Sequence, residues 1–363
     1  MSDIALHLDS TRARAACLGP SGVMVPVLDS MGQVAMPMVV AEGHRGELVS
    51  GRQAAMLALD HPSRWSGHFL PNIGAARFGR HGADTARLLE LSLEPMKRIR
   101  KRDSIVSLTA PAYLDDSLLT ATARAVESAG WKVRVASSSA LALWCAAREQ
   151  AAAPSGIVCE CDEHAMSLSL VAENGDRVSV HAVRVLRNLS LSAWRKCIVS
   201  GLADATVRSI RRDPRADSRL DGALARHAAS WLDEEAPPAR PTALELNGNG
   251  WNAKLTITPG QVIDWCAPLL RLLGKAISEL QAVAGATGPA KALVLASTAR
   301  LPGVARLAES LHENWLGPLH PDAQLEAQVG WLGAVNRGEA DPGLWRSAPV
   351  SPPAVALACQ GAP

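Results

Sequence analysis

The sequence has very little tyrosine and phenylalanine, no long apolar run and almost no net charge. Its 363 residues include Tyr 1 and Phe 2 against Trp 10, and the formal net charge is +2. Single-stranded nucleic acids are bound on aromatic rings within cationic grooves, so this composition argues against nucleic-acid binding. No uncharged apolar segment reaches the roughly 18 residues that a bilayer requires, so no membrane span is expected.

The sequence also lacks the features of an export signal. Its start, MSDIALHLDS, has no basic stretch followed by a long apolar run. Of the seven cysteines, only Cys159 and Cys161 are closely spaced. Cysteines in a protein that is not exported are expected to be reduced and mostly buried. We therefore expect a cytoplasmic protein, and its length allows two lobes.

The order of apolar segments predicts an α/β protein, because buried strands alternate with amphipathic helices. The dipeptide Asn174-Gly175 between two alternating segments predicts a hairpin. Strands are expected at 4–8, 14–18, 23–27, 104–111, 131–136, within 155–184, at 243–257 as a second hairpin, and at 291–297. Helices are expected at 52–59, 84–101, 115–130, 137–150, 190–233, 258–285, 301–315 and 324–338.

Five segments, taken in order, resemble the nucleotide-binding domain of DnaK-type heat-shock chaperones, in the actin-like ATPase superfamily. The clearest is VSLTAPAYLDDSLLTATARAVESAGWKVRVASSSALAL. It is similar to the family's V-P-A-Y-F-x-D strand end, the helix and A-G-L strand that follow, and the N-E-P-T-A-A-A-L helix. The other segments are IALHLDSTRARAA, LVSGRQAAMLALDHPSRW, KALVLASTARLPGVARL and PDAQLEAQVGWLGAV. The resemblance covers about residues 4–338.

The resemblance implies a two-lobed actin-like ATPase fold, with duplicated ribonuclease-H-like lobes around a central nucleotide cleft. Lobe I is expected at 1–153 and lobe II at 154–338, with a small inserted subdomain at about 215–258. Residues 339–363 are expected to be a flexible tail rich in Pro and Ala. The family's peptide-binding domain, which follows its ATPase domain, is not expected here.

The first phosphate turn of the family has lost its glycine in this sequence. An actin-type ATPase needs glycines there because backbone N–H groups must approach phosphate oxygens closely. Asp9 remains, but Thr11 stands at the glycine position and Arg12 at the next hydroxyl position. The family's catalytic lysine falls at about Leu70 or Pro71, and neither side chain can replace it.

The second phosphate turn coincides with the segment CECDEHAMSLSL. The family pattern is a strand followed by D-x-G-G-G-T. Glu160 aligns with the first acid, and Asp162, Glu163 and His164 align with the three glycines. The added carboxylates would repel a triphosphate, and three side chains would obstruct the turn.

Ser138 stands at the family's glutamate in N-E-P-T. The adenosine elements are also altered, because Ala296 and Ser297 replace the final glycine pair. Arg300 keeps the position of the residue that lies near the adenine in the family. Losses at every phosphate and adenosine element predict a vestigial nucleotide cleft with no catalytic residues and no cofactor.

Cys159, Cys161 and His164 are weak candidates for a metal site. Residues two apart share one face of a strand, so both thiols could reach one ion. No fourth ligand is evident and Cys-x-Cys is not the usual spacing of zinc turns. Buried cysteines in a core strand are the favoured interpretation, and no metal is expected.

The sequence therefore predicts a DnaK-like pseudo-ATPase that acts as a protein-interaction, scaffolding or regulatory module related to chaperones. The expected partner is a protein, such as a full-length chaperone of the same family or its client. One alternative is a divergent ATP-binding ATPase that uses magnesium with Asp9, Arg12, Glu160 and Arg300. A second alternative is an actin-like assembly or adaptor protein. The sequence leaves enzymatic activity and oligomeric state open.

Overall fold

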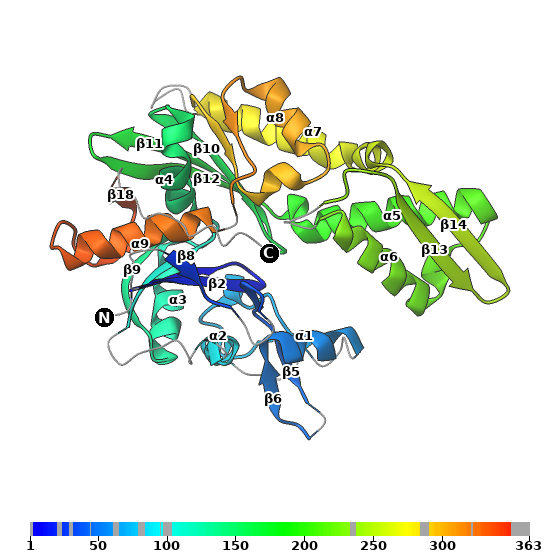
Figure 1. Cartoon of the computed structure of the whole chain (residues 1–363), viewed down its shortest axis with the longest axis horizontal. Coiled ribbons are helices and arrows are strands. Elements are labelled where there is room, and N and C mark those ends of the chain that lie inside the picture. Colours follow the sequence, from blue (N-terminus) through cyan, green and yellow to red (C-terminus); the bar gives the residue numbers. More distant parts are fainter. Residues whose placement is uncertain are drawn as a thin grey trace. The chain divides into compact units, whose positions relative to one another are not determined.

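The computed structural model describes residues 3–19, 24–28, 32–43, 45–60, 65–78, 84–94, 96, 104–232, 237–283, 290–320 and 322–349. These residues form a mixed α/β protein (Figure 1). The chain separates into two compact units. Unit 1 comprises Met1–Val158, Ser169–Val183 and Asp322–Pro363, and unit 2 comprises Cys159–Leu168 and Arg184–Pro321.

Unit 1 is built on a mixed sheet in the order β17-β9-β8-β1-β2-β3, in which β4 also pairs with β2. Strand β1 pairs antiparallel with β2 and parallel with β8, and β8 pairs parallel with β9. The strands are β1 (Asp3–Leu8), β2 (Arg12–Leu18), β3 (Met24–Pro26), β4 (Ala35–Pro37), β8 (Ile105–Ala110), β9 (Lys132–Ser138) and β17 (Gly343–Trp345). The strands predicted in this part of the sequence are confirmed.

Alternation along β1 assigns its side chains to two helical layers. Ile4, Leu6 and Leu8 belong to the large core that α2 and α3 complete. Ala5 lies on the other face with residues of α9, where small side chains allow the helix to approach the sheet closely. The helices are α2 (Thr85–Leu93), α3 (Asp116–Ser128), α4 (Ser139–Ala151) and α9 (Ala323–Asn336), and Figure 1 shows α9 alongside β8. The last part of the helix predicted at 84–101, residues 97–101, lies outside the described residues.

Unit 1 also contains a small three-stranded sheet with one helix packed against it. The sheet has the order β6-β5-β7, and α1 packs against it through Ala54. Its elements are β5 (Val40–Glu42), β6 (Leu48–Ser50), β7 (Trp65–Ser66), α1 (Gly51–Asp60) and the 3-10 helix η2 (Leu70–Asn72).

A second large sheet has the order β16-β15-β10-β11-β12-β18. Five of its strands, in the order β12-β11-β10-β15-β16, correspond to β3-β2-β1-β8-β9 of the first sheet. In both sheets, three strands that are consecutive in the chain lie side by side, and two later strands add next to the first of the three. The strands are β10 (Ser155–Cys161), β11 (Met166–Asn174), β12 (Arg177–Leu186), β15 (Leu293–Leu295), β16 (Trp315–Leu316) and β18 (Ser347–Pro349). The predicted Asn174-Gly175 hairpin is confirmed, with Gly175 at φ +64°.

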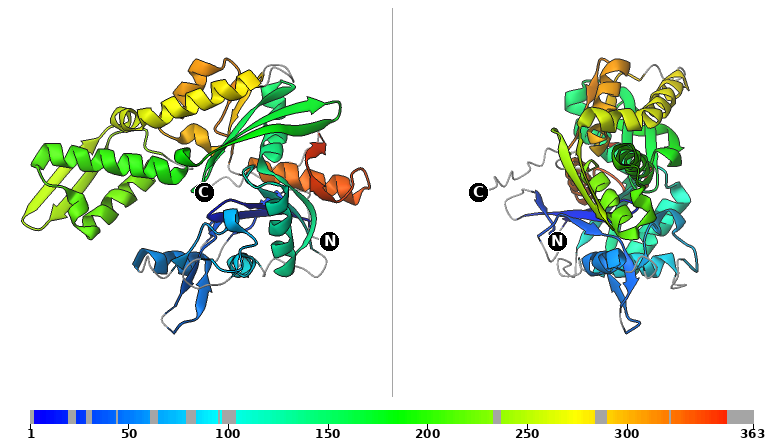
Figure 2. Two further views of the ribbon diagram at one scale, coloured as in Figure 1. Left: turned by 180° about the vertical axis from the view of Figure 1, so that it is seen from behind. Right: turned by 90° about the vertical axis from the view of Figure 1, so that its right-hand side faces the viewer.

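Unit 2 carries a layer of helices and a hairpin. Strands β13 and β14 pair antiparallel over their whole length, as predicted for 243–257, and lie beside α5 and α6 in both views of Figure 2. Ser190 caps α5 by accepting a hydrogen bond from the backbone N of Ala193. The elements are α5 (Leu191–Ile210), α6 (Ser218–Ser230), α7 (Pro259–Val283), α8 (Val304–Leu311), β13 (Thr242–Gly248), β14 (Trp251–Ile257), η4 (Arg187–Leu189), η5 (Pro214–Ala216) and η7 (Ser297–Arg300).

The range expected to be a flexible tail, 339–363, contains strands β17 and β18. Strand β17 pairs parallel with β9 and β18 pairs antiparallel with β12, so these residues have regular backbone partners. Residues 350–363 lie outside the described part of the chain. Among the described helices, none is both long enough and apolar enough to cross a membrane.

Candidate functional site

The turn between β1 and β2 is closed by the carboxylate of Asp9. Its Oδ1 accepts hydrogen bonds from the backbone N of Thr11 and of Arg12, both at 2.7 Å. The Thr11 hydroxyl donates to the same oxygen at 3.2 Å, and the Asp9 backbone N donates to the Arg12 carbonyl at 2.9 Å. The N–H groups of this turn are therefore bonded to an anion that the turn itself supplies.

The turn between β10 and β11 has the same construction around Asp162. The Asp162 Oδ1 accepts from the backbone N of His164 at 2.8 Å and of Ala165 at 3.0 Å. The Asp162 backbone N donates to the Ala165 carbonyl at 3.0 Å, and its carbonyl accepts from Leu191 N at 2.9 Å. Asp162 is only 6% exposed, so its charge is held in the turn by these N–H groups rather than by water.

The two turns hold the same place after their strands. Asp9 follows the last residue of β1, and Asp162 follows the last residue of β10. Asp9 and Asp162 are therefore equivalent within this structure. Glu160, which the sequence placed at the first acid of the second turn, lies inside β10 two residues before Asp162.

Glu163 is paired with Arg195 of α5 and is therefore not a free anion in the turn. The Arg195 Nη1 donates to Glu163 Oε2 at 3.1 Å, and Nη2 contacts Oε1. The Glu163 side chain is 11% exposed and that of Arg195 35%. Arg195 was not predicted from the sequence, since a partner 32 residues away leaves no local pattern.

The segment η7 is anchored on β10 through Cys159. The Cys159 carbonyl accepts hydrogen bonds from the backbone N of Ala296 and from the Thr298 hydroxyl, each at 3.1 Å. These bonds hold Ser297 and Arg300 beside the end of β10 within unit 2. Ala296, Ser297 and Arg300, which the sequence assigned to the adenosine element, thus lie together on one segment near Cys161.

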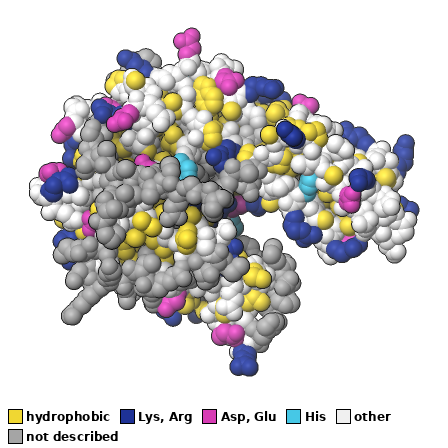
Figure 3. Space-filling view, viewed as in Figure 1, with side chains coloured by type: hydrophobic (Ala, Val, Ile, Leu, Met, Phe, Trp, Pro, Cys, Tyr) yellow, Lys and Arg dark blue, Asp and Glu magenta, His cyan; other side chains and the backbone are white. Residues whose placement is uncertain are grey.

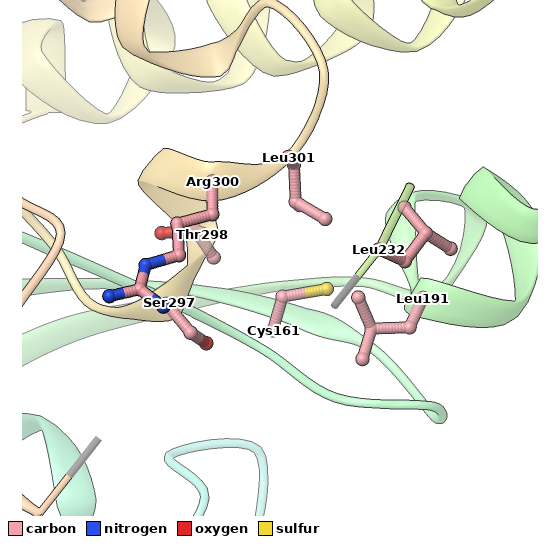
Figure 4. Close-up of a pocket in the computed structure, with 7 residues that line it drawn as sticks. All are labelled: Cys161, Leu191, Leu232, Ser297, Thr298, Arg300 and Leu301. Atoms are coloured by element: carbon pink, nitrogen blue, oxygen red, sulfur yellow. The ribbon is translucent and has the colours of Figure 1, made fainter. Parts of the chain in front are cut away.

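A small pocket of about 10 Å³, partly open to solvent, lies between these elements. Figure 4 shows the Cys161 sulfur directed toward Leu191 and Leu232, whereas the Arg300 guanidinium lies on the other side, near Ser297. The Arg300 Nη1 is buried and has no hydrogen-bond partner among the described residues. The pocket therefore combines an apolar wall with one cation that could bind an anionic or acceptor group. Its lining residues are Cys161, Leu191, Leu232, Ser297, Thr298, Arg300 and Leu301.

The remaining predicted residues have structural contacts in unit 1. The Ser138 hydroxyl caps α4 by accepting from Ala140 N at 3.2 Å. The parallel strands β1, β8 and β9 are in register, so Ser138 lies at the same sheet edge as the Asp9 turn. Leu70, at the expected lysine position, is fully buried in the core. No described contact gives either side chain a part in phosphate chemistry.

Two of the three metal candidates, Cys159 and Cys161, are thiols with raised pKa values. Burial raises the pKa of the Cys159 thiol to about 12, and burial together with the neighbouring Asp162 carboxylate raises the pKa of Cys161 well above its ordinary value. The Cys161 thiol donates to the Leu189 carbonyl at 3.4 Å. Within the described residues, no group of three or more His, Cys, Asp or Glu side chains is placed to hold a metal ion.

Comparison with protein-family models finds no family that matches the chain, and comparison with curated proteins finds no matching relative.

Proposed function

We propose that this chain is a DnaK-like pseudo-ATPase that acts through protein contacts. The repeated strand order of the two large sheets supports the duplicated lobes of an actin-like fold, because each sheet has three consecutive strands followed by two that arrive after helices. This order is shared by folds with many functions, so the functional argument rests on the turns.

The observation that carries the proposal is the closure of both turns by aspartate. A phosphate-binding turn must present N–H groups that its ligand can reach. Here the N–H groups of Thr11, Arg12, His164 and Ala165 already donate to Asp9 or Asp162. A phosphate would have to displace a carboxylate from each turn and would be repelled by it.

The argument holds for either placement of the acid. If Asp162 instead of Glu160 takes the first acid of D-x-G-G-G-T, the glycine positions fall on His164, Ala165 and Met166, and the threonine position on Ser167. All three glycines are thus replaced, and none of the replacements can adopt the close backbone approach that glycine allows. The proposed loss of tight ATP binding therefore does not depend on the original placement of Glu160.

One polar group favours the alternative of a divergent nucleotide-binding protein. The Arg300 Nη1 lines the small pocket and is buried without a hydrogen-bond partner in the described part of the chain. Unpaired buried donors cost free energy, about 1–3 kcal/mol each, and a bound ligand would remove that cost. An Arg300→Ala variant therefore belongs in any nucleotide-binding experiment, because residual binding through this cation would be lost in it.

The proposed contact surface lies on unit 2, where Lys and Arg side chains gather over α5, α6 and the β13–β14 hairpin (Figure 3). At the end of α5, Arg208, Arg211 and Arg212 are all exposed. An acidic patch on a partner protein would complement this end and speed association. The partner class that we propose is a full-length chaperone of the DnaK type.

Binding to such a chaperone tests the proposal. The full chain is titrated into the chaperone in its ATP state and in its ADP state, and complex formation is followed by sedimentation velocity. Saturable binding that weakens on replacing Arg208, Arg211 and Arg212 by Ala supports the proposal. No binding in either state, or a ladder of self-assembled species without chaperone, contradicts it, and the second result favours an assembly protein.

A further inference from the structure

Two thiols from different helices meet inside unit 2. Cys197 lies on α5 and Cys266 on α7. The Cys197 thiol donates a hydrogen bond to the carbonyl of Trp265 at 3.0 Å, so it lies beside the residue that precedes Cys266, and each of the two thiols shifts the pKa of the other. The two sulfur atoms are therefore neighbours, although the cysteines are far apart in the sequence.

The helices approach each other closely at this point because of a glycine. A Cβ atom at Gly201, one turn after Cys197, would overlap the ring of Trp265, the residue before Cys266. The indole therefore lies directly against the backbone of α5. This close approach of α5 and α7 holds Cys197 and Cys266 at the same level along the two helices.

The two thiols differ in their exposure to solvent and in how each affects the pKa of the other. Cys197 is partly exposed, whereas Cys266 is fully buried. Burial is the largest cause and raises the pKa of both thiols, while the neighbouring Cys266 acts to lower the pKa of Cys197 and the neighbouring Cys197 acts to raise the pKa of Cys266 further. An oxidant from solvent would therefore meet Cys197 first, with Cys266 in place behind it.

We propose that Cys197 and Cys266 form a reversible disulfide when the protein meets a peroxide. The Cys197 thiolate attacks one oxygen of hydrogen peroxide, the O–O bond breaks, and the other oxygen leaves as water after taking up a proton, so that Cys197 becomes a sulfenic acid. The Cys266 sulfur then attacks the Cys197 sulfur, the S–O bond breaks and a second water leaves. Two thiols and one peroxide thus give one disulfide and two waters.

The reaction is slow at neutral pH and accelerates as the pH rises. Burial is the largest influence on both thiols and raises the pKa of each above its ordinary value. Only the thiolate reacts. At pH values below the pKa of Cys197, the rate of the first step therefore increases about tenfold for each unit by which the pH is raised. The pair is therefore a slow, stoichiometric modification site and not a peroxide-consuming enzyme.

The disulfide would fix α5 to α7, two elements that line an open groove. The groove has a volume of about 760 Å³ and is lined by α5, β14 and the start of α7. Asp204 and Asp264 line it from the two helices, and Trp265 joins them. Oxidation would therefore restrict the motion of α5 relative to α7, and these two helices form walls of the groove. The inference stands independently of the proposed function.

Two other described cysteines bond to carbonyl oxygens instead. The Cys145 thiol donates to the Pro349 carbonyl, and the Cys161 thiol donates to the Leu189 carbonyl. Cys359 lies outside the described residues, so the experiment uses the full chain with Cys359→Ser alongside the wild type.

The test is peptide mapping of the full chain after hydrogen peroxide and alkylation, without reduction. We expect a peptide pair joined through Cys197 and Cys266, with a loss of two hydrogens, in the wild type and in Cys359→Ser, and its disappearance after dithiothreitol. With Cys266→Ala, dimedone should label Cys197 as a trapped sulfenic acid, and with Cys197→Ser neither product should appear.

Two outcomes would overturn the inference. One is full alkylation of Cys197 and Cys266 in the wild type after a peroxide dose that oxidises an exposed methionine such as Met56, which is 64% exposed. The other is a disulfide that joins Cys197 to any cysteine except Cys266. The wild-type mapping needs no substitution, so a variant that fails to fold does not affect these outcomes.

Discussion

Asp9 and Asp162 close two different turns with the same backbone hydrogen bonds. In each turn the aspartate Oδ1 accepts from the N–H groups two and three residues later, and the aspartate N–H donates to the carbonyl three residues later. The two strands that lead into them, β1 and β10, also hold corresponding places in their sheets. The two turns therefore share a hydrogen-bond pattern as well as a place in the strand order of their sheets.

Replacing Asp162 by Ala should destabilise the protein by about 1–3 kcal/mol, because two buried N–H groups lose their acceptor. Asp162→Asn keeps an acceptor oxygen and should cost less. Urea unfolding followed by circular dichroism measures both. Asp176→Ala, at an exposed turn position, is the matched control and should change stability by less than about 0.5 kcal/mol. Equal stability of Asp162→Ala and the control would refute the role of this carboxylate.

Removing only one partner of the ion pair between Arg14 and Asp322 should lower the free energy of unfolding strongly. The Arg14 Nη1 lies 3.5 Å from Asp322 Oδ1, and both side chains are 9% exposed. Asp322→Ala removes this counter-charge from a buried guanidinium and should cost about 3–5 kcal/mol. The double variant Arg14→Met with Asp322→Leu should recover most of that loss. Unfolding free energies of the three proteins check this, and a double variant as unstable as the single one would contradict it.

Buried His7 should make the protein less stable in mild acid. Its Nδ1 lies 3.1 Å from the Thr109 hydroxyl, and burial followed by repulsion from Arg14 lowers its pKa to about 3. The unfolded chain takes up a proton near pH 6.5, whereas the folded chain does not. The contribution of His7 to stability is therefore complete above about pH 6.5 and is lost as the pH falls toward 3.

The stability lost through His7 depends on how far the pH falls below about 6.5. Between about pH 6.5 and 5 the wild type should lose about 2 kcal/mol through His7 alone. His7→Gln, which cannot titrate, should lack this contribution. Urea midpoints in neutral buffer and in mild acid compare the two proteins. Parallel losses in both would show that His7 does not carry the pH dependence.

Gly201 and Gly222 should respond in opposite directions to the same substitution. Gly201→Ala places a methyl group into the Trp265 ring, and overpacking of this kind costs about 1–3 kcal/mol. Gly222 lies inside α6, where the nearest atom to a new Cβ is the flexible Arg226 Nη1 at 3.5 Å. Gly222→Ala should therefore stabilise the protein by about 0.5–1 kcal/mol. Thermal unfolding of both variants distinguishes a packing glycine from a replaceable one.

Much of the secondary structure could be predicted because local patterns specify it. The Asn174-Gly175 turn and the Ser190 cap use short-range chemistry that a sequence displays directly. The end of β10 could not be placed, since polar Glu160 inside a strand looks like the start of a turn. The position of this strand end depends on pairing with β11 and on the Asp162 hydrogen bonds, and these form only when the chain has folded.

The contacts around the candidate site were harder to foresee. Arg195 pairs with Glu163 across 32 residues, and η7 reaches β10 through bonds to the Cys159 carbonyl across 139 residues. Such contacts are set by how the elements pack, and a single sequence carries no periodic signal for them. The proximity of Cys197 and Cys266 was missed for the same reason.

Isothermal titration calorimetry of the full chain with ATP and with ADP, each with magnesium, tests the proposed loss of nucleotide binding most directly. Asp162→Asn and Arg300→Ala are titrated in parallel. The closed turns predict no saturable heat for the wild type with either nucleotide up to millimolar concentration. Stoichiometric binding with a micromolar Kd that Arg300→Ala abolishes would contradict the pseudo-ATPase proposal and establish a divergent nucleotide site.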